Sequence, residues 1–299
     1  MTGRPLRAVL RVVLPWAVAA VALAGCTREQ PATSAHYVVG APYEAGGQWH
    51  YPRVFGSYDR TGLASVISSG HAATTTDGET FREGGLMAQS PVLPLPSLVR
   101  ITNLQNGRSL TVRVNDRGPE MPGRLVAVTR HVAGLLGFPD GGVAEVRVEL
   151  LADRSSALQS SLGAGLHMTA APVASVLATA LPPPPGTAGS AGPSSVTFQA
   201  TKATPATGTF AGPLSGVVHQ GTPEPGPLYV QIGGFGSGND AREQLYRLGG
   251  MPGTVVPQPG LSETLYAVRL GPYDSVEAAD AALAQVLRRG VPSPEIVVR

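Results

Sequence analysis

The chain has 299 residues, of which 38 are Gly and 28 are Pro, while only 5% are aromatic. This length suits about two ordinary domains, and the composition argues against one continuous core. The 22 Lys and Arg nearly balance the 20 Asp and Glu, so a net charge of +2 argues against nucleic acid as a partner. The single Cys excludes an intramolecular disulfide, a Cys-rich zinc site and an iron–sulfur cluster; no metal and no other cofactor is expected.

Residues 1–26 have the pattern of an export signal. Three Arg residues precede an apolar run from Val12 to Ala22, and the small residues Leu23-Ala24-Gly25-Cys26 follow it. The run is shorter than the about 20 residues that a membrane-spanning helix needs. The tetrapeptide resembles a bacterial lipobox, which implies a lipid on Cys26 that anchors the protein to a membrane. Thr27 replaces the Asp associated with inner-membrane retention, so the resemblance implies outer-membrane attachment facing the periplasm.

Residues 27–61 are predicted to be an extended leader, and residues 62–151 to be rich in β-strands. Apolar and polar residues alternate over three segments, Leu98–Thr102, Leu110–Val114 and Ala144–Leu150. Asn106-Gly107, between the first two, is a hairpin signal. A short helix is predicted between the cap Thr129 and Gly137. Many short strands with one brief helix favour a small closed barrel over a sandwich.

Residues 152–226 are predicted to be a disordered linker. From Ser155 to Pro223 the only formal charge is Lys202, and Ala, Ser, Thr, Gly and Pro dominate the composition. Such a segment buries too little apolar surface to offset its conformational entropy. The four prolines from Pro182 to Pro185 favour an extended polyproline conformation.

The last part of the chain is predicted to follow the order βαββαβ. Four segments have the pattern of strands, Leu228–Ile232, Thr254–Pro257, Thr264–Leu270 and Glu295–Arg299. Asn239 is a plausible cap for a helix that stops at Gly249. Asp274 and Glu277 have the spacing of a capping box before a second helix that stops at Gly290. This order predicts a ferredoxin-like α+β domain.

RNA-binding domains share this order, but residues 226–299 carry six Arg and seven acidic residues, which is too few basic groups for RNA. The segments Tyr229-Val-Gln-Ile-Gly-Gly-Phe235 and Tyr266-Ala-Val-Arg-Leu-Gly-Pro-Tyr273 resemble the two signatures of the SPOR domain, over residues 227–299. That resemblance implies binding to peptidoglycan glycan strands without stem peptides, which are enriched at the division septum. Five residues would contact the sugar chain: Gln231, Phe235, Tyr266, Arg269 and Tyr273. Alternatively, the three aromatic residues are simply half-buried in the sheet.

Residues before the linker carry a second resemblance. The motifs Val112-Arg-Val-Asn-Asp-Arg-Gly-Pro119, Leu93-Pro-Leu-Pro-Ser97, Asn106-Gly-Arg-Ser109 and Asp77-Gly-Glu79 are similar to those of the rare lipoprotein A family. The resemblance implies a double-psi β-barrel. The expected protein is therefore mainly β plus α+β: lipoprotein signal, barrel, disordered linker and SPOR domain.

The family resemblance implies an endolytic peptidoglycan lytic transglycosylase, a lyase that cuts the bond from N-acetylmuramic acid to N-acetylglucosamine and leaves 1,6-anhydro-muramic ends. Asp116 and Glu79 match the two acidic positions, and one carboxylic acid would protonate the leaving oxygen. Asp116 is alternatively a turn residue and Glu79 a solvated charge. Ser90 stands where the family has a His, and His71 matches a second family His, so both are candidates for the groove.

Three functions remain open from the sequence. The first is a septal lytic transglycosylase, the second a non-catalytic septal peptidoglycan-binding lipoprotein, and the third an expansin-like protein that loosens the wall without cleavage. All three take glycan strands as the partner, with the membrane reached through Cys26. Proteins of the division site are further possible partners.

Overall fold

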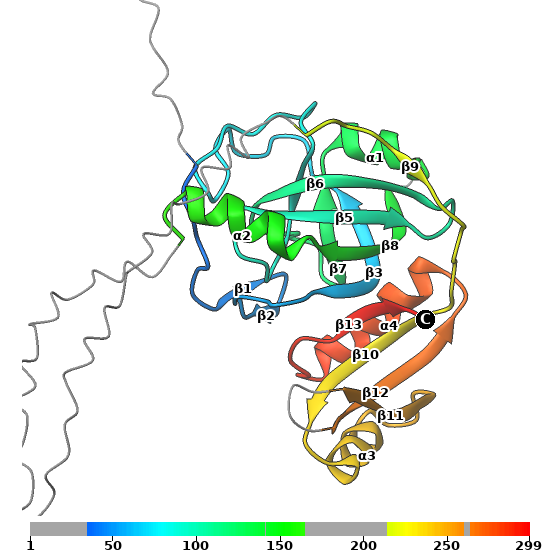
Figure 1. Ribbon diagram of the computed structural model, residues 1–299. Coiled ribbons are helices and arrows are strands. Elements are labelled where there is room, and N and C mark those ends of the chain that lie inside the picture. The colour runs from blue at the N-terminus through cyan, green and yellow to red at the C-terminus, as the bar shows by residue number, and fades with distance from the viewer. Residues whose placement is uncertain (1–34, 141, 165–213, 260–263) are drawn as a thin grey trace, which may run out of the picture. The chain divides into compact units, whose positions relative to one another are not determined.

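The computed structural model of the protein describes residues 35–140, 142–164, 214–259 and 264–299 (Figure 1). The predicted export signal, the lipobox with Cys26 and most of the predicted linker lie outside the described residues. The described residues contain one sheet that closes into a barrel and a separate four-stranded sheet packed with helices.

Six strands form the barrel, which confirms the predicted fold class. They are β3 (Asp59–Val66), β4 (Met87–Gln89), β5 (Ser97–Asn103), β6 (Arg108–Asp116), β7 (Arg124–Val128) and β8 (Val143–Leu150). Their order in the sheet is β4-β7-β3-β8-β5-β6, and β4 also pairs with β6, so no edge is left between them. The pairs β3–β7 and β4–β6 are parallel, and the remaining pairs are antiparallel.

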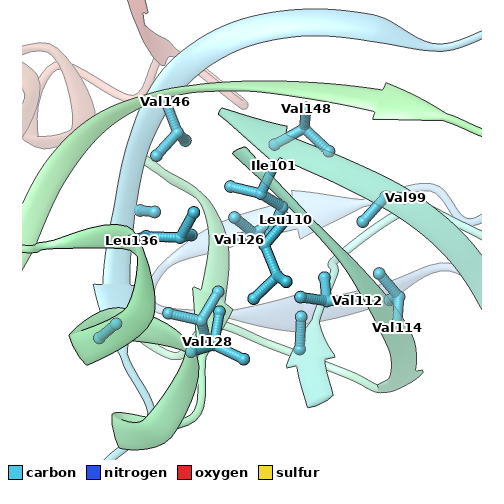
Figure 2. Packing of buried hydrophobic residues seen from close by; sticks show 14 of the residues in the cluster. Val99, Ile101, Leu110, Val112, Val114, Val126, Val128, Leu136, Val146 and Val148 are labelled. Atoms are coloured by element: carbon cyan, nitrogen blue, oxygen red, sulfur yellow. The ribbon is translucent and has the colours of Figure 1, made fainter. Parts of the chain in front are cut away.

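The interior of the barrel is filled by branched aliphatic side chains, as Figure 2 shows. Every second residue of a strand points inward because side chains alternate along a strand. The labelled residues are Val99, Ile101, Leu110, Val112, Val114, Val126, Val128, Leu136, Val146 and Val148, each at most 1% exposed. Burial of one such side chain contributes roughly 1.5–3 kcal/mol, so this interior fixes the strand ends that carry the polar groups described below.

The predicted hairpin and short helix of the barrel are both confirmed. Gly107 has φ +75° in the turn between β5 and β6, and its N–H donates to Asn103 O at 2.8 Å. Helix α1 (Arg130–Leu136) begins after Thr129, whose side chain accepts from the N–H of Val132, and ends at Gly137 in the left-handed conformation.

The leader is not simply extended: it forms a hairpin and is bonded to the barrel. Strand β1 (Tyr43–Ala45) pairs with β2 (Gln48–His50), the exposed Trp49 lying opposite Glu44. Val38 exchanges two backbone hydrogen bonds with Leu95, both at 2.8 Å. The described part of the leader therefore belongs to the barrel domain.

The two ends of the predicted linker are also bonded to the barrel. Helix α2 (Ala152–Ser161) packs on β5, and the Ser155 hydroxyl accepts from Leu98 N at 2.9 Å. Residues 214–226, called the return segment below, contain β9 (His219–Gln220), which pairs with β6. Glu224 N then donates to Leu104 O at 2.8 Å. The prediction of disorder is wrong for these two ends. Their composition offers few side chains for a core of their own, but they are ordered by hydrogen bonds to the sheet of the barrel.

The C-terminal domain has the predicted order βαββαβ. Its elements are β10 (Leu228–Phe235), α3 (Gly238–Arg247), β11 (Gly253–Pro259), β12 (Thr264–Tyr273), α4 (Val276–Arg288) and β13 (Glu295–Val298). The antiparallel sheet has the order β11-β12-β10-β13. Side chains from α3 and α4 share a core with one face of β10 and β12, including Ala241, Leu283, Val286, Val230, Ile232, Val268 and Leu270.

The helix caps of this domain differ from the predicted ones. Ser237 rather than Asn239 caps α3, its hydroxyl accepting from Asp240 N at 3.2 Å. Ser275 rather than the Asp274–Glu277 pair caps α4 and accepts from Ala278 N at 3.1 Å. In both cases a Ser hydroxyl three residues before the bonded N–H competes successfully with the neighbouring Asn or Asp.

Candidate active site

Asp116, the last residue of β6, is the centre of a cluster of hydrogen-bond donors. Its Oδ1 accepts from Thr76 N at 2.9 Å, from Thr76 Oγ1 at 2.6 Å and from Arg117 N at 2.8 Å. Its Oδ2 accepts from Gln89 Nε2 at 3.0 Å and lies 2.6 Å from His71 Nε2. The candidate acid predicted from sequence is therefore held by groups from three separate segments of the barrel.

These contacts decide the charge of Asp116. Burial alone would raise the pKa of this carboxyl, but the hydrogen bonds from Thr76, Gln89 and Arg117 outweigh burial and hold the pKa below its ordinary value. Asp116 is therefore an anion at neutral pH. Because an ionised carboxylate only accepts, the imidazole of His71 donates its Nε2–H to Asp116. The pair joins a fixed negative charge to a group that can carry a proton.

His71 is the more accessible member of this pair. Its side chain is 21% exposed, compared with 8% for that of Asp116. The edge of its ring meets Phe81, with the ring centroids 4.7 Å apart and the planes at 69°. Asp116 and Phe81 together fix the orientation of the imidazole.

Gly118 makes the contact between Gln89 and Asp116 possible. The φ of Gly118 is +137°, a conformation that side chains disfavour. A Cβ added at this position would lie 2.6 Å from the amide oxygen of Gln89. The Asp-Arg-Gly-Pro motif therefore has a steric reason for its Gly: the backbone must pass close to the amide that binds the carboxylate.

Ser90 does not face the groove as its match to a family His suggested. It is 0% exposed, and its hydroxyl accepts from the N–H groups of Val92 at 3.4 Å and Leu93 at 3.3 Å. Its own N–H donates to the main-chain oxygen of Asp116 at 3.1 Å. Ser90 thus closes a buried turn beside the backbone of Asp116, and no described contact joins its side chain to the carboxylate.

Glu79 lies near the cluster but is engaged by a cation. It forms an ion pair with Arg113 and accepts a hydrogen bond from Asn115 Nδ2 at 2.8 Å. Its side chain is 19% exposed. Protein groups thus hold both carboxylate oxygens of Glu79, Oε1 through Arg113 and Oε2 through Asn115.

Asp77 is an unusual carboxyl that sequence reasoning did not select. It is 0% exposed, its Oδ1 accepts from Thr75 Oγ1 at 2.7 Å, and its Oδ2 has no hydrogen-bond partner in the described residues. Its pKa is raised to about 6, chiefly by burial and in smaller part by the charge of the neighbouring Glu79. The signal in the sequence was the presence of two acidic residues two positions apart in Asp77-Gly-Glu79.

The guanidinium of Arg117 ties the leader to this site. It donates to Val39 O in the leader, and to Ser90 O at 3.2 Å and Leu93 O at 2.6 Å in the loop after β4. Nearby, the Tyr43 hydroxyl donates to Pro91 O at 3.3 Å. The leader therefore forms a wall beside the Asp116 loop, a role that its sequence did not indicate.

The residues predicted to bind glycan on the SPOR sheet fall on two faces. Gln231 pairs with Arg269 across β10 and β12, and Arg269 Nη2 donates to Gln231 Oε1 at 3.2 Å. Tyr229 shares the face of Gln231, and the Arg269 guanidinium carbon lies 5.5 Å from the Tyr229 ring centroid. The Nε of Arg269 is buried and has no hydrogen-bond partner in the described residues. Tyr229, which was not predicted as a binding residue, completes this group.

The other three predicted residues pack toward the helices. Phe235, Tyr266 and Tyr273 are half-buried against the core that α3 and α4 share. A Cβ on Gly238, at the start of α3, would lie 3.4 Å from Tyr266. For these three, the alternative that they are sheet aromatics fits the packing better than a common sugar-binding face.

Neither a metal site nor a membrane-spanning helix is found among the described residues. There, no three His, Cys, Asp or Glu side chains are grouped so as to hold a metal ion. Nor does that part of the chain contain a helix long and apolar enough to cross a membrane.

Comparison with known proteins assigns both domains. A family described as lytic transglycolase matches residues 60–148, and the SPOR domain family matches residues 224–297. The chain is 28% identical over 278 residues to a Pseudomonas aeruginosa protein named endolytic peptidoglycan transglycosylase RlpA; the match covers 86% of this chain and 76% of that protein.

Proteins of the same name in other bacteria match a shorter stretch of the chain. The Rickettsia bellii protein is 38% identical over 120 residues, which cover 39% of this chain and 53% of that protein. The Campylobacter jejuni protein is 34% identical over 131 residues, covering 43% of this chain and 48% of that protein. The chain thus spans about half the length of these two relatives. Together, the closed barrel, the SPOR domain and these likenesses show that the chain belongs to the rare lipoprotein A (RlpA) family with a C-terminal SPOR domain.

Proposed function

We propose that the protein is a peptidoglycan lytic transglycosylase that cuts glycan strands without stem peptides and leaves 1,6-anhydro-muramic ends. The observation that carries this proposal is the 2.6 Å contact between His71 Nε2 and Asp116 Oδ2 at the surface of the barrel. It places a group able to donate and accept a proton beside a fixed anion. The names of the relatives and the lytic transglycolase match of residues 60–148 support the same reaction.

In this reaction the protein gives one proton to the leaving sugar oxygen and later takes one proton back from the substrate. The bond between C1 of N-acetylmuramic acid and the oxygen of the next sugar breaks, and that oxygen takes a proton from the protein. The 6-hydroxyl of the same muramic acid then attacks C1, and its proton returns to the protein. No water enters, and the protein ends in its starting protonation state.

The geometry assigns different parts of this task to the two residues. The donors around Asp116 occupy both of its oxygens, and its depressed pKa disfavours the protonated form. Asp116 therefore orients His71 and stabilises positive charge on the imidazole and on the developing oxocarbenium centre. Since Nε2 is committed to Asp116, the second ring nitrogen, Nδ1, exchanges the proton with the sugar oxygens.

A cell-envelope location follows from the same proposal. The SPOR face of Tyr229, Gln231 and Arg269 binds glycan strands from which stem peptides have been removed, which retains the enzyme at the septum. A lipid on Cys26 anchors it in the outer membrane with its domains in the periplasm. Proteins of the division site are its expected neighbours.

The test is chromatography of the fragments formed from denuded glycan strands by the full chain. We expect anhydro-muramic ends with the parent protein and a loss of at least about 100-fold with His71→Ala or Asp116→Asn, in line with removal of a general acid–base group. His131→Ala is the matched control because His131 is exposed on α1. Folding of each variant is verified by its melting curve.

One observation favours a second function, that of a non-catalytic septal peptidoglycan-binding lipoprotein. Both oxygens of Asp116 are satisfied by protein donors, as in a structural carboxylate, and Ser90 replaces a family His. Under this alternative the parent protein binds denuded strands but forms no anhydro ends. Altered mechanics of the wall without new ends would instead point to expansin-like loosening.

A further inference from the structure

We propose that the leader hairpin forms a second sugar-binding subsite, which receives the glycan strand as it leaves the Asp116 site. The aromatic hairpin is defined here as β1 and β2 with the following residue, Tyr43–Tyr51. The inference rests on the proposed function, because it names where the same polysaccharide continues on the protein. It concerns binding rather than chemistry.

The aromatic hairpin is continuous with the Asp116 site. The Tyr43 hydroxyl donates to Pro91 O at 3.3 Å, one residue from the turn at Ser90 that bonds the backbone of Asp116. The charges of Arg117 and Asp116 both act on the Tyr43 phenol, which places the ring beside the Asp116 loop. Opposite Tyr43 in the hairpin lies His50, with the ring centroids 5.2 Å apart. Tyr43 and His50 therefore place one face of the hairpin beside the carboxylate loop.

Two large rings at the far strand of the hairpin are exposed. Trp49 is 47% exposed and Tyr51 is 58% exposed in the described structure. They are two positions apart in an extended segment, so their side chains project to the same side of the hairpin, opposite to that of His50 and Tyr43. Exposed aromatic surface is unfavourable in water, and its concentration on one short element is typical of a binding site. Sugar rings suit it because their apolar faces stack on aromatic faces.

The charges of this element suit a strand without stem peptides. Burial lowers the pKa of His50, so at neutral pH its imidazole is uncharged and stacks without an ionic requirement. Just beyond the hairpin, the Arg53 guanidinium carbon lies 4.8 Å from the Phe55 ring centroid, which presents a cation at the same end. Removal of stem peptides leaves free lactyl carboxylates on muramic acid, and Arg53 is placed to bind one.

Binding of glycan strands at this subsite can be measured by tryptophan fluorescence of the full chain. The chain has two Trp, Trp16 in the export signal and Trp49 in the hairpin, so Trp16→Phe leaves Trp49 as the only tryptophan. Asp116→Asn in the same chain keeps the strands intact during titration. We expect denuded glycan strands to change the Trp49 emission in a saturable way. The SPOR domain has no Trp, but its Ser293 hydroxyl donates to Trp49 O at 2.7 Å, so Arg269→Ala in the same chain is the control for binding at the SPOR face.

A pair of exposed substitutions tests the contribution of the aromatic surface. Tyr51→Ala is expected to weaken the titration about three- to tenfold, the loss typical of one stacking contact. Val54→Ala is the matched control: Val54 is 67% exposed in the same segment but is not aromatic, and the titration should be unchanged. In the cleaving protein, Tyr51→Ala should raise KM for long strands and leave kcat unchanged.

The outcomes separate this inference from the proposed function. A Trp49 signal that does not respond to strands retained by the protein in a pull-down overturns the subsite, even if the parent forms anhydro ends. Equal effects of Tyr51→Ala and Val54→Ala overturn it as well. A responsive signal with no anhydro ends supports the subsite while the catalytic proposal fails.

Discussion

The imidazole of His71 and the carboxylate of Asp116 meet at 2.6 Å although 45 positions separate them in the chain. The loop before β4 supplies His71 and the end of β6 supplies Asp116, so only closure of the barrel brings them together. The depressed pKa of Asp116 means that its hydrogen bonds stabilise the fold at neutral pH. That contribution is lost only as the pH falls below the ordinary value of 3.8 and through the lower folded value.

Asp77 should show the opposite pH dependence. Its folded pKa is about 6 and its ordinary value is 3.8, so ionisation above pH 6 destabilises the folded state by at most about 3 kcal/mol. Asp77→Asn should therefore raise the free energy of unfolding at pH 7.5, and the gain should shrink as the pH falls from 6 to 3.8. Urea denaturation at pH 7.5 and pH 4 measures this. An equal effect at both pH values would contradict the assignment.

Ser90→His should not activate the enzyme. The match of Ser90 to a family His suggests that an imidazole at this position would raise activity. The structure places Ser90 in a turn with 0% exposure, where a larger ring costs about 1–3 kcal/mol through overpacking. We expect a lower melting temperature and no increase in anhydro ends. An active, equally stable variant would show that an imidazole at this position reaches the site.

Substitutions in the SPOR domain should separate binding from stability. Arg269→Ala and Tyr229→Ala remove groups from the face opposite the helices, so pull-down with denuded sacculi should weaken several-fold with little change in melting temperature. Tyr266→Ala removes a ring packed against the helices and should lower stability by roughly 1–2 kcal/mol. Normal stability of Tyr266→Ala combined with lost binding would restore Tyr266 to the sugar-binding face.

Cys26→Ser tests the lipid anchor. Without the thiol no acyl chain is attached, so the variant should remain an unprocessed precursor and take up no labelled fatty acid in growing cells. Membrane fractionation provides a second readout, with the parent in the membrane fraction. Unchanged labelling of the Cys26→Ser protein would show that the lipobox is not the site of attachment.

The regular elements were predictable because each has a local cause. Alternation located β5, β6 and β8, Asn106-Gly107 located their hairpin, and Thr129 and Gly137 located the short helix. Apolar residues repeat at a fixed spacing along an element with one buried face, so the element can be recognised before the fold is known. The caps of α3 and α4 were less certain, because Ser, Asn and Asp stand within two residues and any of them can accept the N–H.

What the sequence could not show are the contacts made by backbone groups. The hydrogen bonds that fix the leader and the return segment to the barrel use main-chain N–H and C=O, which every residue possesses. No side-chain pattern marks them. The two faces of the SPOR sheet, by contrast, could be predicted from residue spacing. Tyr229 and Gln231 are two positions apart on one strand and so lie on the same face, whereas Tyr266 is three positions from Arg269 and lies on the opposite face.

The return segment changes how the length of residues 165–213 should be understood. Helix α2 before them and β9 after them are both bonded to the barrel, so these residues begin and end on the same domain. The SPOR domain that follows β9 is held on the barrel by side-chain contacts, including the hydrogen bond from Thr61 Oγ1 to Val298 O at 2.6 Å and the ion pair between Arg124 and Asp280. We therefore expect a change in the number of residues between α2 and β9 to leave the spacing between the Asp116 site and the SPOR sheet unchanged.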